Sequence, residues 1–235
     1  MLVTGCELSL FADGFLPGVV YERIAGLPSG RPELFAALAA MPARLNGFLA
    51  ETAAAARARF GGPLSYASGM WEPVGWEPFD IAATDAYRDA ANAARFRDEL
   101  RQRAGTGKPL VVTEFGCCGY AGAADRGGMG WAIIDQAADP PRLDGDYLRD
   151  ETEQVRYLRE LRAVFEEEGV DLAFWFTFAG YGLAHHAEPR RDLDLASYGV
   201  VRMLEDGPPA GHQGLGWEPK LAFATLAEPQ DSEAG

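Results

Sequence analysis

The sequence predicts an α/β protein whose strands pair in parallel. Short apolar segments rich in β-branched residues, such as residues 110–115 and 171–178, alternate with longer segments whose apolar residues recur at helical spacing. A helical crossover returns the chain to the same end of the sheet, so strands separated by helices pair in parallel. This rhythm fits both an open doubly wound sheet and a barrel.

The predicted strands and loops follow from apolar runs and from glycine-rich stretches. Strands are expected at residues 2–8, 64–68, 79–87, 110–115 and 171–178. Irregular segments rich in Gly or Pro are expected at residues 11–30, 116–145 and 180–216. The second of these loops directly follows a strand and is unusually long for a connector, which indicates a functional rim.

The predicted helices follow from apolar spacing and from end signals. A long helix is expected from Pro32, which suits a first turn, to Gly61, with a bend at Pro42. The others are expected from Asn92 to Gly105, from Asp146 or Asp150 to Gly169, and at residues 218–226. The expected organisation is one domain over residues 1–227 and a disordered tail at residues 228–235.

Composition narrows the function classes. The net charge of −14 argues against nucleic-acid and anionic membrane partners, which require a basic face. No stretch approaches the roughly 20 apolar residues of a membrane span, and the N-terminus lacks a secretory pattern, so a cytoplasmic protein is expected. Three cysteines, two of them adjacent, indicate reduced thiols rather than a disulfide framework.

Two glutamates end apolar strands. Glu114 lies near the end of the run at residues 110–115, two positions before Gly116, and Glu7 lies near the end of the first predicted strand. An acid delivered where the chain turns lies at a rim that a ligand can reach. The pair predicts a site with two carboxylates.

Side-chain alternation adds further candidates, because successive residues of a strand face opposite sides. Asp85 and Tyr87 share a face at the end of their strand, so they are expected at the same rim as the glutamates. In the last strand, Trp175 is expected to point inward. Bulky apolar residues are expected on its helix-covered outer face: Leu172, Phe174, Phe176 and Phe178.

Several segments together resemble a known family. The segments are Thr4-Gly5-Cys6-Glu7, residues 80–87, Val112-Thr113-Glu114-Phe115-Gly116, Phe174-Trp175-Phe176-Thr177 and residues 217–223. They are similar to the second half of the retaining glycoside hydrolase clan with a (β/α)8 barrel, whose catalytic glutamates end strands four and seven. The resemblance runs from Leu2 to about Leu226. It implies a partial TIM barrel containing strands four to eight, with strands one to three absent.

The resemblance also implies roles for single residues. Glu114 would be the nucleophile and Glu7 the acid/base, and Tyr87 and Trp175 would line the sugar subsite. Cleavage with retention of the anomeric configuration requires the two carboxyl groups to lie about 5 to 5.5 Å apart. The clan usually has Asn before the strand-four glutamate, where this chain has Cys6.

Other residues are assigned with their alternatives. Asp85 and Tyr87 are candidates for lining the sugar site or for ordinary hydrogen bonding at the strand end. Trp71 is a candidate for flanking a cleft or for covering the short crossover, and His185 for binding substrate. Cys117 and Cys118 with His185 and His186 match no spacing of a zinc site, so neither a metal nor a cofactor is expected.

Three functions remain open at this stage. The first is a glycosidase or transglycosidase acting on a carbohydrate. The second is a non-catalytic barrel remnant that binds a sugar or a protein. Phage defence is included here, because Gly-Cys-Glu-Leu-Ser-Leu-Phe and Glu-Phe-Gly-Cys-Cys resemble segments of proteins labelled as abortive phage infection proteins. The third is an α/β protein whose carboxylates hold a metal. Five strands do not close a barrel, so a fragment of a longer product or a homodimer that covers the strand edges is expected.

Overall fold

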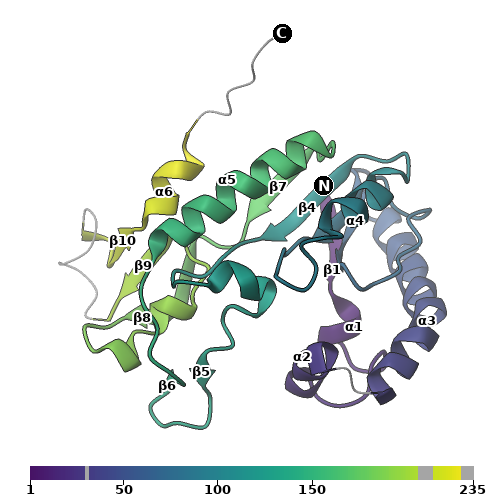
Figure 1. Ribbon diagram of the computed structural model, residues 1–235. Coiled ribbons are helices and arrows are strands. Elements are labelled where there is room, and N and C mark those ends of the chain that lie inside the picture. Colours follow the sequence, from purple (N-terminus) through teal and green to yellow (C-terminus); the bar gives the residue numbers. More distant parts are fainter. Residues whose placement is uncertain (30–31, 206–213, 229–235) are drawn as a thin grey trace. The chain divides into compact units, whose positions relative to one another are not determined.

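The computed structural model describes residues 1–29, 32–205 and 214–228 (Figure 1). The chain divides into two compact units. Unit 1 comprises Met1–Ala86, Asp98–Thr113 and Glu168–Ala173. Unit 2 comprises Tyr87–Arg97, Glu114–Glu167 and Phe174–Gly235. The single domain expected over residues 1–227 stays a prediction.

Five strands form the main sheet, in the order β1-β2-β3-β4-β7. They are β1 (Leu2–Cys6), β2 (Leu64–Gly69), β3 (Ala82–Asp85), β4 (Leu110–Phe115) and β7 (Leu172–Trp175). β2 pairs in parallel with both β1 and β3, with Leu2 opposite Leu64 and Ala67 opposite Ala83. The predicted α/β class is confirmed.

The strand order distinguishes between the two arrangements that the sequence leaves open. A doubly wound sheet reverses its order at a switch point, whereas the strands of a (β/α)8 barrel follow the chain. Here the order follows the chain without reversal, as in part of a barrel. β1 and β7 are the two ends of this order, as expected for the edge strands.

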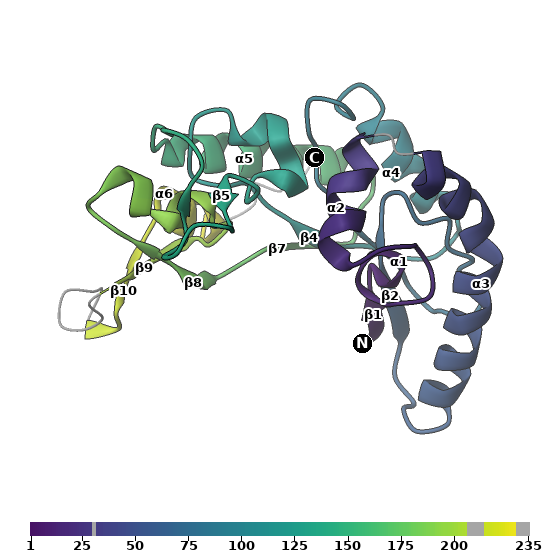
Figure 2. The ribbon, with the colours of Figure 1, turned by 90° about the horizontal axis from the view of Figure 1, so that it is seen from below.

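The helices of unit 1 include α1 (Leu8–Phe11), α2 (Val20–Ser29) and α3 (Pro32–Arg57), while α4 (Phe96–Ala104) begins in unit 2. α3 begins at Pro32 as predicted and continues through Pro42. It packs on β1 and β2 (Figure 2). Residues at four-residue intervals form its buried face: Met41, Leu45, Leu49 and Ala53. They share a core with Leu64, Tyr66 and Phe79.

A substitution in this core tests the packing of unit 1. Leu45 is completely buried, so Leu45→Ala should lower the free energy of unfolding by about 2–5 kcal/mol through lost burial and a cavity. Leu172→Ala is the matched control, because this leucine is exposed and its loss should change stability by less than about 0.5 kcal/mol. Urea unfolding of both variants makes the comparison, and equal losses would contradict the assignment of the core.

Unit 2 is built around α5 (Glu151–Glu167), which ends before Gly169 as predicted, and α6 (Leu221–Leu226), which packs against it. Three of its strands form a sheet in the order β10-β9-β8: β8 (Ala179–His185), β9 (Val201–Leu204) and β10 (Trp217–Pro219). Two short strands form a separate pair: β5 (Ile134–Asp135) and β6 (Arg142–Leu143). Short 3₁₀ helices lie at Ala123–Met129, Pro189–Arg191 and Leu193–Ala196.

Several predicted boundaries are wrong. The first strand ends at Cys6 rather than at residue 8, and the expected loop at residues 11–30 contains α2. Arg23 supports α2, because its buried guanidinium donates to the carbonyl oxygens of Leu10 and Ala12, each at 3.0 Å, and binds Asp13. The expected loop at residues 180–216 contains β8 and β9, which pair in parallel. α2 is thus tied to residues 10–13, and β8 to β9, by contacts outside each element.

The direction of Trp175 also differs from the prediction. Trp175 packs against Phe115, with ring centroids 5.3 Å apart, and Phe115 in turn contacts Phe165 of α5 at 5.0 Å. The residues expected under helices are instead between 40% and 57% exposed: Leu172, Phe174, Phe176 and Phe178. The strand ends at Trp175 rather than at residue 178, and Trp175 is its one partly buried residue. The prediction failed because bulky apolar residues also occur on exposed faces.

Two further predictions concern the tail and the membrane. The tail expected at residues 228–235 lies outside the described residues except for Glu228, which pairs with Arg159 at 2.9 Å. Within the described ranges, no helix has both the length and the apolar character that crossing a bilayer requires.

Candidate functional site

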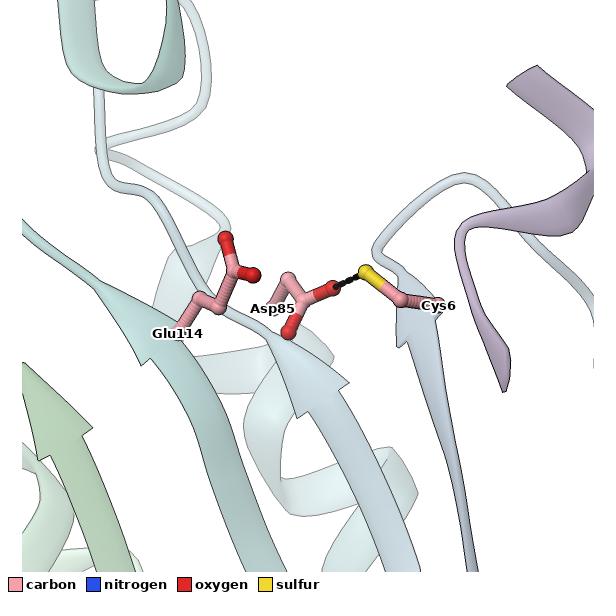
Figure 3. Close-up of side chains that lie close together, drawn as sticks. All are labelled: Cys6, Asp85 and Glu114. Carbon is pink, nitrogen blue, oxygen red and sulfur yellow. Dashed lines mark hydrogen bonds between the residues drawn. The ribbon is translucent and has the colours of Figure 1, made fainter. Parts of the chain in front are cut away.

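Glu114 lies near the end of β4, where the sequence places it, and its side chain is half-buried. The hydroxyl of Tyr87 donates a hydrogen bond to Glu114 Oε2 at 3.2 Å. Asn92 fixes the backbone of Tyr87, because its amide donates to the Tyr87 carbonyl oxygen at 2.8 Å. The structure therefore brings two predicted site residues of unit 2 together. Figure 3 shows the Glu114 side chain at the end of its strand.

Aromatic rings surround this pair in unit 2. The ring of Tyr87 meets that of Tyr198 edge to face at 5.8 Å, and Tyr198 contacts Phe176 at 6.0 Å. Tyr198 is fixed by its hydroxyl, which donates to the Gly127 carbonyl oxygen and accepts from the Gly130 amide. Phe176 is 40% exposed, so part of its ring remains accessible as a stacking surface.

Sequence reasoning misses Tyr198 and Phe176 as site residues. Tyr198 lies in a segment expected to be a loop, and Phe176 is expected on the helix-covered face. The alternation of the last strand contains the signal for Phe176, because it groups this residue on the face opposite to Trp175. A side chain at Gly116 would conflict with this arrangement, since its Cβ would lie 2.3 Å from the Phe176 carbonyl oxygen.

Asp85 ends β3 in unit 1 and is only 2% exposed. Thr113 Oγ1 donates to its Oδ1 at 2.7 Å, and the Cys6 thiol donates to its Oδ2 at 3.3 Å (Figure 3). Burial raises the pKa of Asp85 to about 6, although both hydrogen bonds act to lower it. Cys6 is therefore a hydrogen-bond partner of a buried carboxyl group.

The raised pKa predicts how stability depends on pH. Between the ordinary pKa of 3.8 and about 6, the folded state binds more protons at Asp85 than the unfolded state does. Stability from this residue is thus present below pH 4 and is lost as the pH rises through 6, a difference of about 2–3 kcal/mol.

Asp85→Asn should remove this dependence, so the variant should gain stability relative to the native protein as the pH rises from 4 to 7. Urea unfolding at several pH values measures the difference. Parallel pH profiles for the two proteins would contradict the raised pKa.

Glu7 follows β1 and is not part of it. Its backbone is left-handed, with φ 41° and ψ 43°, a conformation that costs a residue other than glycine about 1–2 kcal/mol. Its amide donates to the Ala67 carbonyl oxygen at 2.9 Å, and its carbonyl accepts from the amides of Leu10 and Phe11. The expectation that Glu7 continues the strand is wrong, because the chain turns into α1 at this residue.

Three further predicted residues make contacts within their own units. Trp71 of unit 1 is half-buried and donates its indole N–H to Ser9 Oγ at 3.1 Å. His185 of unit 2 ends β8, with its Nδ1 2.9 Å from Asp192 Oδ1. The Trp175 indole N–H donates to the Tyr198 carbonyl oxygen at 2.9 Å, so this side chain supports the aromatic group from the packed side.

The adjacent cysteines of unit 2 are buried. Burial raises the pKa of the thiols of Cys117 and Cys118 well above the ordinary value, so both are protonated at neutral pH. Thiols in this state are poor metal ligands, because the thiolate is the binding form.

The described chain is thus an α/β protein whose five parallel strands follow the chain order, with acidic residues at strand ends. No protein-family model matches the sequence, and no curated protein matches it either. Among solved structures, it is similar to a GH113 β-1,4-mannanase complex at 16% identity and a TM-score of 0.49, over 68% of this chain and 48% of that one. It is also similar to the GH113 β-mannanase AaManA from Alicyclobacillus acidocaldarius in complex with ManMIm. That match has 20% identity and a TM-score of 0.45, over 57% of this chain and 40% of the other. The chain spans less than half the length of these chains.

Proposed function

We propose that this chain is a glycoside hydrolase-like protein that cleaves or transfers a glycosidic bond by a retaining mechanism with two carboxylates. Glu114 is the nucleophile and Glu7 the acid/base. The observation that supports this proposal most strongly is the hydrogen bond from Tyr87 to Glu114 beside the rings of Tyr198 and Phe176. A carboxylate oriented by a phenol beside accessible aromatic surface suits attack on a bound sugar.

The reaction follows from these roles. Glu114 attacks the anomeric carbon and forms a glycosyl ester, while the protonated Glu7 gives its proton to the leaving oxygen. Glu7 then takes a proton from water or from an acceptor hydroxyl, which displaces Glu114 and restores both groups. Two carboxyl groups suffice for this chemistry, so no cofactor takes part.

The substrate contacts follow from the same arrangement. Tyr87 and Phe176 contact the sugar at the subsite of Glu114, and Phe176 takes the stacking role first expected of Trp175. Trp71 and His185 contact more distant parts of the carbohydrate. Asp85 lines the sugar site, where it supports the neighbouring side chains of Thr113 and Cys6.

A second candidate function is non-catalytic binding of a carbohydrate or a protein, including a role in phage defence. The exposed side chains of Phe174, Phe176 and Phe178 favour it, because large apolar residues gathered on an accessible face often mark a binding surface. This candidate requires binding without turnover.

Labelling with activated 2-deoxy-2-fluoroglycosides separates the two candidates. A panel of glucosides, mannosides and galactosides is incubated with the protein, and the labelled peptide is mapped by mass spectrometry. A stable ester at Glu114 is the expected result. Sugar binding detected by calorimetry with no covalent label from any member of the panel would favour the second candidate, and a label on another carboxylate would contradict the assignment of Glu114.

A further inference from the structure

Unit 1 contains a buried carboxylate that the proposed reaction does not use. Glu72 is 4% exposed and accepts three hydrogen bonds. Its Oε1 accepts from the Ser9 amide at 2.9 Å, while its Oε2 accepts from the Tyr66 hydroxyl at 2.9 Å and the Gly69 amide at 3.0 Å. A carboxylate removed from water requires such charge-assisted hydrogen bonds, so these three donors fix the position of the Glu72 side chain.

Two of the partners belong to the turn that follows Glu7. The Ser9 amide binds Glu72 directly, and the Leu8 amide donates to the Tyr66 hydroxyl at 2.7 Å. These are the first two amides of α1, which the helix itself cannot satisfy. The Glu7 side chain makes no capping hydrogen bond to α1. Tyr66 and Glu72 therefore supply the cap from the neighbouring strand and loop.

The hydroxyl of Tyr66 links the Leu8 amide to the Glu72 carboxylate. It accepts from the Leu8 amide and donates to Glu72. Burial and the nearby Glu72 raise the pKa of Tyr66 far above its ordinary value, so the hydroxyl keeps its proton. Trp71 adds a third contact to the same turn through Ser9 Oγ.

We infer that Tyr66 and Glu72 are positioning residues for Glu7, which hold the turn after β1 so that the left-handed backbone of Glu7 is maintained. The inference rests on the proposed role of Glu7 as acid/base. A general acid must keep its carboxyl group within a narrow geometry, and a displacement of about 1 Å can cost about a hundredfold in rate. Substitution of either residue therefore acts on proton transfer rather than on sugar binding.

The test uses Glu72→Gln and Tyr66→Phe, with Glu7→Ala as the reference and Glu77→Gln as an exposed control in the same loop region. Both positioning variants should lower kcat about 10- to 100-fold for glycosides with poor leaving groups, which need a proton. A dinitrophenyl glycoside needs no proton on its leaving group. For this substrate the two variants should change the rate of bond cleavage by less than about threefold and leave KM unaltered. The double variant should resemble each single variant, because the two residues act as one group.

A second readout does not depend on activity. Hydrogen exchange at the amides of Leu8 and Ser9 should accelerate at least about tenfold in both variants and stay unchanged in Glu77→Gln. If Glu72→Gln fails to fold, Tyr66→Phe, which keeps the ring, provides both measurements.

The outcomes separate the inference from the proposed function. If Glu7→Ala shows no dependence on the leaving group, the acid/base role of Glu7 itself fails. A different result is that Glu7→Ala shows this dependence while Tyr66→Phe and Glu72→Gln lower the rate equally for both glycosides, or lower it for neither. That result overturns the positioning role and leaves the proposed function standing.

Discussion

Replacing Glu114 by glutamine should lower kcat/KM for a glycoside by at least about a thousandfold. The substitution keeps the size of the side chain and an oxygen that can accept the Tyr87 hydrogen bond, but the amide cannot form the glycosyl ester. Binding of the sugar should persist, because the aromatic contacts remain. Steady-state kinetics with an aryl glycoside, together with calorimetric binding of the product sugar, provides the measurement.

The matched control for this prediction is Glu166→Gln, which alters an exposed glutamate of α5 in the same unit and should leave kinetics unchanged. Added azide should restore turnover of the smaller variant Glu114→Ala and give a glycosyl azide of inverted configuration, because the azide attacks from the side that the carboxylate leaves empty. Full activity of Glu114→Gln would show that another group attacks the anomeric carbon.

The largest expected effect on stability concerns an ion pair inside unit 2. The side chains of Lys220 and Asp194 are 0% and 1% exposed, with Nζ and Oδ1 2.8 Å apart. Their contact lacks hydrogen-bond geometry, so it is an ion pair, while Asp194 Oδ2 also binds Arg149 at 2.8 Å. Asp194→Ala leaves the buried ammonium without its partner and should lower the free energy of unfolding by about 3–5 kcal/mol.

Glu228→Ala is the control for this prediction, because it removes a carboxylate whose ion pair with Arg159 is exposed to solvent. Its cost should stay below about 1 kcal/mol. Replacing both partners, as in Asp194→Leu with Lys220→Met, should recover much of the loss, since two buried charges are then removed together. Equal losses from Asp194→Ala and Glu228→Ala in urea unfolding would contradict the importance of the buried pair.

The parts of the fold that can be predicted are those in which local pattern and final environment agree. Residues 110–115 combine β-branched residues with a strand-ending acid, and they form β4 with the predicted bounds. Pro32 begins α3 because its fixed φ suits a first helical turn, and the spacing of Met41 and Leu45 matches the buried face. The strand predicted at residues 79–87 is shorter in the structure, where β3 covers Ala82–Asp85 and Tyr87 lies outside it.

Other features depend on contacts between distant residues. α2 contains Gly26 and Pro28, both of which indicate a loop, but Arg23 ties it to residues 10–13. The amides of Leu8 and Ser9, which follow the left-handed Glu7, donate to side chains 58 and 63 positions away, and no local pattern reveals these partners. The face of Trp175 could not be assigned because alternation separates two faces without saying which one a helix covers.

The separation of two carboxyl groups tests the central claim most directly. A crystal structure of the protein with a trapped fluorosugar at Glu114 gives the distance between the carboxyl groups of Glu7 and Glu114. The retaining mechanism predicts about 5 to 5.5 Å. A separation beyond about 6.5 Å, or side chains that reach different surfaces of the protein, would contradict the assignment of these residues as a catalytic pair.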